Sequence, residues 1–131
     1  MFDPTTYNSD FLEKKNWGWK YNIYTDHFIG IDFCFAKKGG ESSWHFHDHQ
    51  YNMFLVTAGR LRITREAAPE SDKRITFVIG DGCKDRVTRI HPAHTHKFEV
   101  LEDVSFIEVM YVRLDRNDIT RITDALYNYP S

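Results

Sequence analysis

Residues 42–63 read SSWHFHDHQYNMFLVTAGRLRI. His45, His47 and His49 stand at alternate positions, followed by an apolar run and then a glycine. Side chains at alternate positions of an extended chain share one face, so the stretch predicts several imidazole rings on one side of a strand. Bulky aromatic residues occupy the other face, so alternation alone does not tell which face is inside.

The rest of the chain predicts an all-β protein, because short segments rich in β-branched and aromatic residues are separated by turn signals such as KKGG and GDG. This pattern is typical of an antiparallel sandwich or barrel. Only residues 117–126 are compatible with a short C-terminal helix. The predicted strands are Trp19–Tyr24, Phe28–Lys37, Ser42–His47, Asn52–Thr57, Leu61–Arg65, Arg74–Ile79, Arg86–His91, His96–Leu101 and Val104–Arg113.

Length and composition exclude several classes of function. We expect an N-terminal arm over 1–15, whose first dozen residues form a loose arm or an edge strand, and a single domain over 16–131, because 131 residues suit one domain. A formal charge of −2 and a pI near 6.4 argue against binding to nucleic acid or to anionic membranes. Cys34 and Cys83 are expected to be free thiols. No signal peptide or membrane-length apolar run is visible, which favours a cytoplasmic protein.

Six of the seven histidines fall in two windows, residues 45–49 and 91–96. Neutral imidazole is a common ligand of divalent transition metals, and an H-x-H pair on one strand places two rings on the same side. A third ligand from a distant strand completes a site that keeps a position open for water or substrate. The two clusters therefore favour a metal site. Crowded surface histidines are the alternative.

The residues around these histidines resemble the cupin superfamily of small β-barrels. The first cupin motif has glycine, five residues, H-x-H, three or four residues, glutamate, six residues and glycine. Gly39, His45, His47, Asn52 and Gly59 match this spacing, with asparagine at the glutamate position. The stretch HPAHTH at 91–96 resembles the second motif, shortened by about one residue, and Arg86 stands where a glycine usually opens it. The resemblance implies a double-stranded β-helix, or jelly-roll barrel.

Within the cupins, three stretches are similar to type II mannose-6-phosphate isomerases. NWGW at 16–19 resembles their proline-tryptophan-glycine segment, and SWHFHDH at 43–49 resembles their S-L-Q-x-H-x-H run. The third stretch is FIEV at 106–109 with NDITR at 117–121 and Asp124, which resembles their I-E-V…D-D-I-V-R…D ending. The likeness covers about residues 16–127.

The resemblance implies a set of site residues. The metal positions it implies are His45, His47, Asn52 and His96, with His94 as the competitor of His96. The ion implied is a divalent transition metal such as Zn, Mn, Fe or Ni. His49 is expected as a fourth ligand or as an acid/base residue.

Other residues each have a structural alternative. Tyr51 is a candidate proton donor, and packing beside a turn is its alternative role. Lys20 is a candidate phosphate contact. Glu108 is a candidate base, with a surface position as its alternative. Cys34 could face the lumen, but it has no local histidine partner and is not expected to be a nucleophile.

Three functions follow as hypotheses. The first is a metal-dependent isomerase that acts on a small phosphorylated or nucleotide-linked sugar through an enediol. The second is a three-histidine iron dioxygenase. The third is a cupin that binds a small ligand without catalysis, or a metal-free ketoisomerase of a nucleotide sugar with His47 or His49 as the acid/base residue. A small-molecule substrate and a homodimer are expected in each case.

Overall fold

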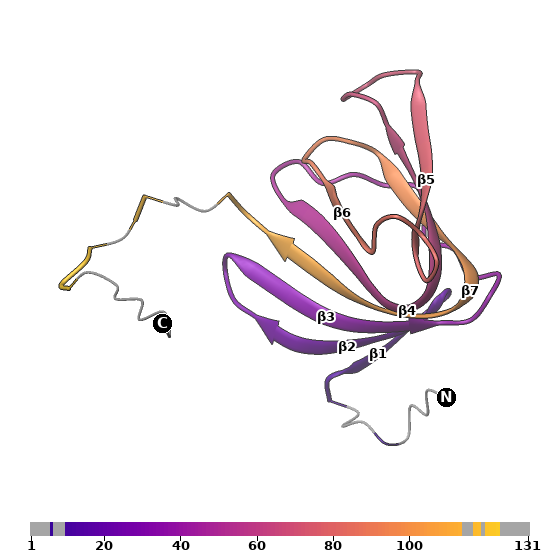
Figure 1. The fold of residues 1–131 in the computed structure, drawn as a ribbon, viewed down its shortest axis with the longest axis horizontal. Coiled ribbons are helices and arrows are strands. Elements are labelled where there is room, and N and C mark those ends of the chain that lie inside the picture. The colour runs from indigo at the N-terminus through magenta and orange to yellow at the C-terminus, as the bar shows by residue number, and fades with distance from the viewer. Residues whose placement is uncertain (1–5, 7–9, 114–116, 119, 124–131) are drawn as a thin grey trace, which may run out of the picture.

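The computed structural model describes residues 6, 10–113, 117–118 and 120–123, and within them every regular element is a β-strand. The strands pair antiparallel in the order β1-β2-β3-β7-β4-β5, and β6 pairs with β4. Figure 1 shows the curved sheet, with β1 to β3 on one side of the long strands and β5 and β6 on the other. The all-β prediction is confirmed. The strands are β1 Leu12–Lys15, β2 Gly18–Thr25, β3 Ile29–Ala36, β4 Tyr51–Glu66, β5 Arg74–Gly80, β6 Val87–Ile90 and β7 His96–Tyr111.

Two strands of 16 residues, β4 and β7, form the centre of the sheet. Four shorter strands were predicted here, and the structure joins them in pairs. The β4–β7 register shifts between Val56 and Leu61, where Thr57 and Ala58 are both exposed. The buried row of β4 therefore changes from even to odd positions across this bulge. The bulge keeps one face of a long, bent strand inside along its whole length.

The inner face of the sheet carries small and polar residues on β3. Asp32, Cys34 and Ala36 are buried, whereas the bulkier Phe33 and Phe35 of the opposite row are half-exposed. The core is filled from other strands and includes Phe54, Val56, Leu61, Ile63, Ile79, Ile90, Phe98, Val100, Val104 and Phe106. Trp17 covers this core at 5.1 Å from Phe98, measured between ring centroids.

Several expectations need correction. The stretch Ser42–His47 is not a strand, because only Glu41 and His45 form isolated bridges there. Leu12–Lys15, at the end of the segment 1–15, is an edge strand paired with β2, one of the two alternatives expected for the start of the chain. Of residues 117–126, only 117, 118 and 120–123 are described, and none of these is helical. The rest of that stretch, like 1–5 and 7–9 of the arm, lies outside the described residues. No helix in the described chain could span a membrane.

Gly59 should be the glycine on which the central bulge depends. Its φ is +82°, and a Cβ there would meet the carbonyl oxygen of Asp103. We expect Gly59→Ala to lower the free energy of unfolding by at least about 3 kcal/mol, because backbone strain adds to the clash. Urea denaturation measures this loss.

Gly82→Ala is the matched control for this substitution. Gly82 also has a positive φ, +71°, but nothing lies within 4 Å of a Cβ built there. It should lose only about 1 kcal/mol, the cost of the strained backbone alone. Equal losses in the two variants would contradict the role of the clash at Gly59.

Candidate metal centre

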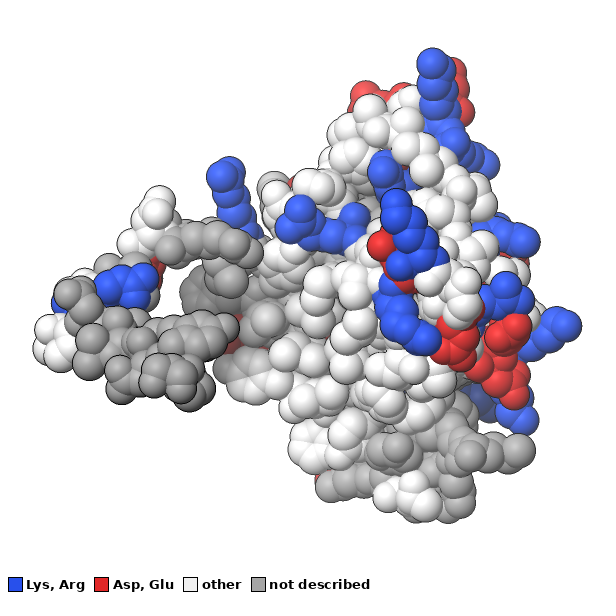
Figure 2. All heavy atoms as spheres, viewed as in Figure 1, with Lys and Arg blue, Asp and Glu red and all other residues white. Residues whose placement is uncertain are grey.

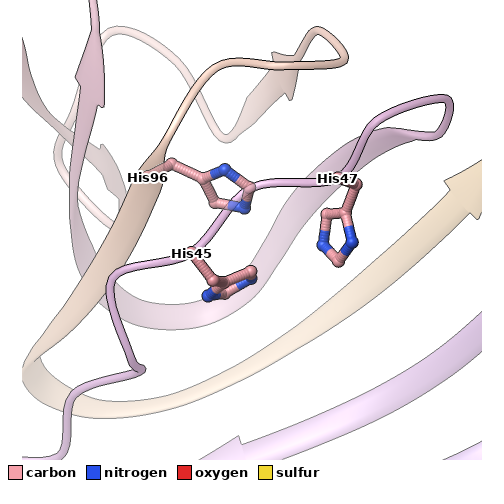
Figure 3. A group of neighbouring side chains, drawn as sticks. All are labelled: His45, His47 and His96. Carbon is pink, nitrogen blue, oxygen red and sulfur yellow. The ribbon is translucent and has the colours of Figure 1, made fainter. Parts of the chain in front are cut away.

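Three histidines from two distant parts of the chain converge on one point. His45, His47 and His96 each offer a ring nitrogen, and these nitrogens all lie within 4.8 Å of one another. The ring centroids of His45 and His96 are 4.6 Å apart, and those of His45 and His47 are 5.1 Å apart. Figure 3 shows the rings turned toward one another, two from the segment before β4 and one from the start of β7. The structure thus brings His96, rather than His94, to the H-x-H pair.

Backbone hydrogen bonds hold the two segments side by side. The amide of His45 donates to the carbonyl of His96 at 3.1 Å, and the amide of His96 donates back at 2.8 Å. The amide of Ala93 donates to the carbonyl of His47 at 2.7 Å. His45 and His47 are therefore fixed by pairing with the segment that ends at β7, although they lie outside any regular strand.

The backbone also selects the tautomers of two rings. His96 Nδ1 lies 2.9 Å from the carbonyl oxygen of His94, and His45 Nδ1 lies 2.9 Å from that of Ser43. A carbonyl oxygen only accepts, so each Nδ1 carries the proton and each Nε2 keeps its lone pair. The Nε2 atoms of His47 and His96 are buried without a hydrogen-bond partner among the described residues. A buried ring nitrogen without a hydrogen-bond partner is available as a metal ligand.

The three rings suit a transition metal. Metal–nitrogen bonds of about 2.0–2.1 Å at tetrahedral angles place ligand nitrogens about 3.3 Å apart, so the rings need to close in by no more than about 1.5 Å. No carboxylate belongs to this group. Three neutral imidazoles leave the full charge of a bound divalent ion on the site. They also leave at least one coordination position for another ligand.

Burial opposes protonation of the same rings. Burial lowers the pKa of His96 to about 4. The nearby His45 and His47 also disfavour the charged form of this ring. Burial, followed by the closeness of His45, lowers the pKa of His47. Both rings are therefore neutral at neutral pH and available to bind a cation.

The other predicted site residues occupy different places. Asn52 is 3% exposed and shares the inner face of β4 with Phe54, and its Oδ1 accepts a hydrogen bond from Gln50 at 3.1 Å. His49 is exposed and lies outside the three-histidine group. Tyr51 alternates with Asn52, so it faces the opposite side of β4, where its ring stacks on Tyr111 at 5.2 Å. The proposed roles of these three residues stay predictions.

Sequence reasoning gave too little weight to a second buried polar group. Lys20, Asp32 and Glu108 lie on β2, β3 and β7, and both carboxylates are buried. The only signal was the position of Asp32 and Cys34 in one alternating row of β3. Cys34 is also fully buried, and burial raises the pKa of its thiol, which agrees with the expectation that it is no nucleophile. Both cysteines are unpaired, as predicted.

No protein-family model and no curated protein sequence matches the chain. Solved structures do match. CapF with the inhibitor 3-isopropenyl-tropolone is 25% identical at a TM-score of 0.62, over 81% of this chain and 31% of that one. The Cnp3 cupin domain of Schizosaccharomyces pombe is 14% identical at 0.64, over 86% and 74%. An oxalate decarboxylase from Bacillus subtilis is 15% identical at 0.65, over 77% and 27%.

The fold and the site together define a class. The chain is a cupin-fold, jelly-roll protein with a three-histidine group that could hold a metal ion. It spans only about a third of the CapF chain that it matches. The finer resemblance to type II mannose-6-phosphate isomerases stays a prediction from the sequence.

Stability of the metal-free protein should depend on pH through His96. Its pKa falls from about 6.5 in the unfolded chain to about 4 in the folded one. Between these values the unfolded state binds more protons, so stability is lost as pH falls from about 6.5 to about 4. The loss attributable to His96 should approach about 3 kcal/mol, and His47 acts in the same direction.

Urea denaturation at pH 7 and pH 4.5 measures this dependence. His96→Gln should remove most of the loss, whereas His49→Gln, at an exposed position, should keep it. An unchanged pH dependence in His96→Gln would contradict the assignment.

Proposed function

We propose that the chain is a metal-dependent cupin isomerase of a small sugar that is phosphorylated or nucleotide-linked. The observation that carries the metal part is the convergence of three ring nitrogens, two of them buried and unpartnered. The sugar part is supported by the resemblance of residues 16–127 to type II mannose-6-phosphate isomerases. It is also supported by the likeness to CapF, which is named a capsular polysaccharide assembling protein in Staphylococcus aureus.

The reaction would transfer a proton between adjacent carbons of an aldose or ketose. A base removes a proton from the carbon next to the carbonyl, the carbonyl oxygen gains a proton, and the resulting enediol is reprotonated at the other carbon. A bound metal supplies Lewis acidity toward the substrate oxygens. The chain contributes the imidazoles that hold the ion, one of them, that of His96, buried.

A three-histidine iron dioxygenase is the second candidate. It is favoured by one observation, the absence of a carboxylate from the histidine group. A binding protein without catalysis is the third. Metal analysis together with oxygen-uptake measurement separates these candidates. Bound iron with substrate-dependent oxygen consumption supports the dioxygenase, and no oxygen consumption supports the isomerase or the binding protein.

Substitution of each histidine should abolish tight metal binding. We expect His45→Ala, His47→Ala and His96→Ala each to weaken Zn²⁺ or Co²⁺ affinity by about 100-fold or more, because two imidazoles hold a divalent ion much less tightly than three. Calorimetric titration measures the metal affinity. His49→Ala, at an exposed position, is the control and should keep the affinity of the wild type.

Activity is tested on the metal-loaded protein. Interconversion of fructose 6-phosphate and mannose 6-phosphate, and of other aldose–ketose phosphate pairs, should be seen and should stop on chelation. Wild-type affinity in all three variants, or no chelator-sensitive turnover on any of these pairs, would refute the proposal.

We also infer a cytoplasmic homodimer. The outward rows of β3, of the first half of β4 and of the second half of β7 carry no charged residue, whereas the other halves of β4 and β7 carry Arg60, Arg62, Lys97 and Glu99. The uncharged residues are Ile29, Ile31, Phe33, Phe35, Tyr51, Met53, Leu55, Ser105, Ile107, Val109 and Tyr111. In Figure 2 the charged side chains gather mainly toward β5, and the surface near β2 and β3 is mostly uncharged. An uncharged face can pair with its own copy about a twofold axis.

The molar mass measured by light scattering, as the protein elutes from a size-exclusion column, should therefore be twice the 15.5 kDa of one chain. Replacing the outward-facing Ile107 with lysine should shift the mass toward that of the monomer, because it places a charge in the interface. A single-chain mass for the wild type contradicts the dimer.

A further inference from the structure

A buried group of charged side chains crosses three neighbouring strands inside the barrel. Lys20 Nζ lies 3.0 Å from Glu108 Oε1 and 3.4 Å from Asp32 Oδ2. Asp32 and Glu108 are directly paired across β3 and β7, and they are 5% and 6% exposed. The side-chain Nδ2 of Asn22 donates to Asp32 Oδ1 at 2.9 Å, which fixes that carboxylate. These residues form an ordered polar wall and not a set of scattered surface charges.

This polar wall shares the lumen with the three histidines. Glu108 is the cross-strand partner of Phe54, and the ring of Phe54 packs 6.5 Å from that of His96. The wall and the histidines are therefore neighbours within one interior.

Stability does not account for these charges. A buried ion pair is often no more stabilising than apolar side chains of the same volume, because desolvation offsets the attraction. Here two carboxylates face one ammonium, which leaves a negative charge in excess. Such an arrangement is costly for the fold alone, and this points to a ligand as the reason for it.

The wall has free hydrogen-bonding capacity. Glu108 uses Oε1 for Lys20, and its Oε2 has no hydrogen bond within the described residues. The ammonium of Lys20 has three N–H groups and, in the described part of the chain, two carboxylate partners. A ligand hydroxyl can donate to the free carboxylate oxygen and accept from the ammonium at the same time. The excess negative charge repels phosphate, so a phosphate would have to lie elsewhere.

We infer that Lys20, Asp32 and Glu108 form the second half of the ligand site and bind a hydroxyl of a polyhydroxylated compound whose neighbouring oxygens reach the three histidines. The inference rests on the proposed metal site and adds the substrate class, an uncharged polyol segment. Glu108 accepts the hydroxyl proton in a hydrogen bond, Lys20 donates to the hydroxyl oxygen, and Asp32 positions Lys20.

The test compares two metal-chelating probes on the Co²⁺-loaded protein, read from the visible absorption of the ion. Acetohydroxamate chelates but has no hydroxyl chain, whereas D-gluconohydroxamate chelates with the same group and carries hydroxyls. In the wild type the sugar probe should bind at least about tenfold more tightly, as expected for one charge-assisted hydrogen bond. In Glu108→Gln and in Lys20→Gln the preference should fall to about threefold or less, with Co²⁺ affinity retained.

Glu102→Gln is the matched control, because Glu102 pairs with Arg60 on the surface at 2.7 Å and should leave the preference intact. Circular dichroism checks that each variant folds. If either Glu108→Gln or Lys20→Gln does not fold, the other variant alone tests the inference. A wild type that binds Co²⁺ but does not distinguish the probes, or a preference that survives both wall substitutions, overturns this inference and leaves the metal site standing. A wild type that does not bind Co²⁺ overturns the metal site as well.

Discussion

The pairing of β4 with β7 is the interaction on which the rest of the molecule depends. It runs from Tyr51 opposite Tyr111 to Arg65 opposite His96, with a bulge in the middle. The first half of β4 thus meets the second half of β7, and the ends of the two strands support the other strands of the sheet. The same register puts His96 at the start of β7, beside the segment that carries His45 and His47. Fold and site are therefore set by one ladder of backbone hydrogen bonds.

Much of this could be predicted from the sequence because the relevant signals are local. Alternation of apolar and polar residues identified the strands, and the H-x-H spacing identified two of the three converging histidines. The joining of predicted strands into β4 and β7 could not be predicted in the same way. Gly59 and the exposed pair after Val56 look like a turn in sequence, whereas cross-strand pairing carries the chain through the bend as a bulge.

The strand predicted over residues 42–47 was wrong for a related reason. Side chains of residues 42–47 alternate as they do in a strand. Alternation indicates which side chains share a face, but it does not indicate whether the backbone is hydrogen-bonded to neighbouring strands. His45 makes its two backbone bonds to His96, and this suffices to aim its ring. The sequence singled out Lys20 and Glu108 but not their burial beside Asp32, because a charged residue in an alternating row is usually on the solvent face. Only the sheet topology shows that the row of Asp32 faces inward.

Cys34 has a practical consequence for work on this protein. It lies on β3 directly opposite Lys20, fully shielded, while Cys83 is partly accessible in a turn. A thiol-alkylating reagent should modify Cys83 in the native molecule, and should modify Cys34 only after the strands around it separate. Labelling of Cys83 would therefore report every molecule, whereas labelling of Cys34 would report only the molecules whose interior has opened.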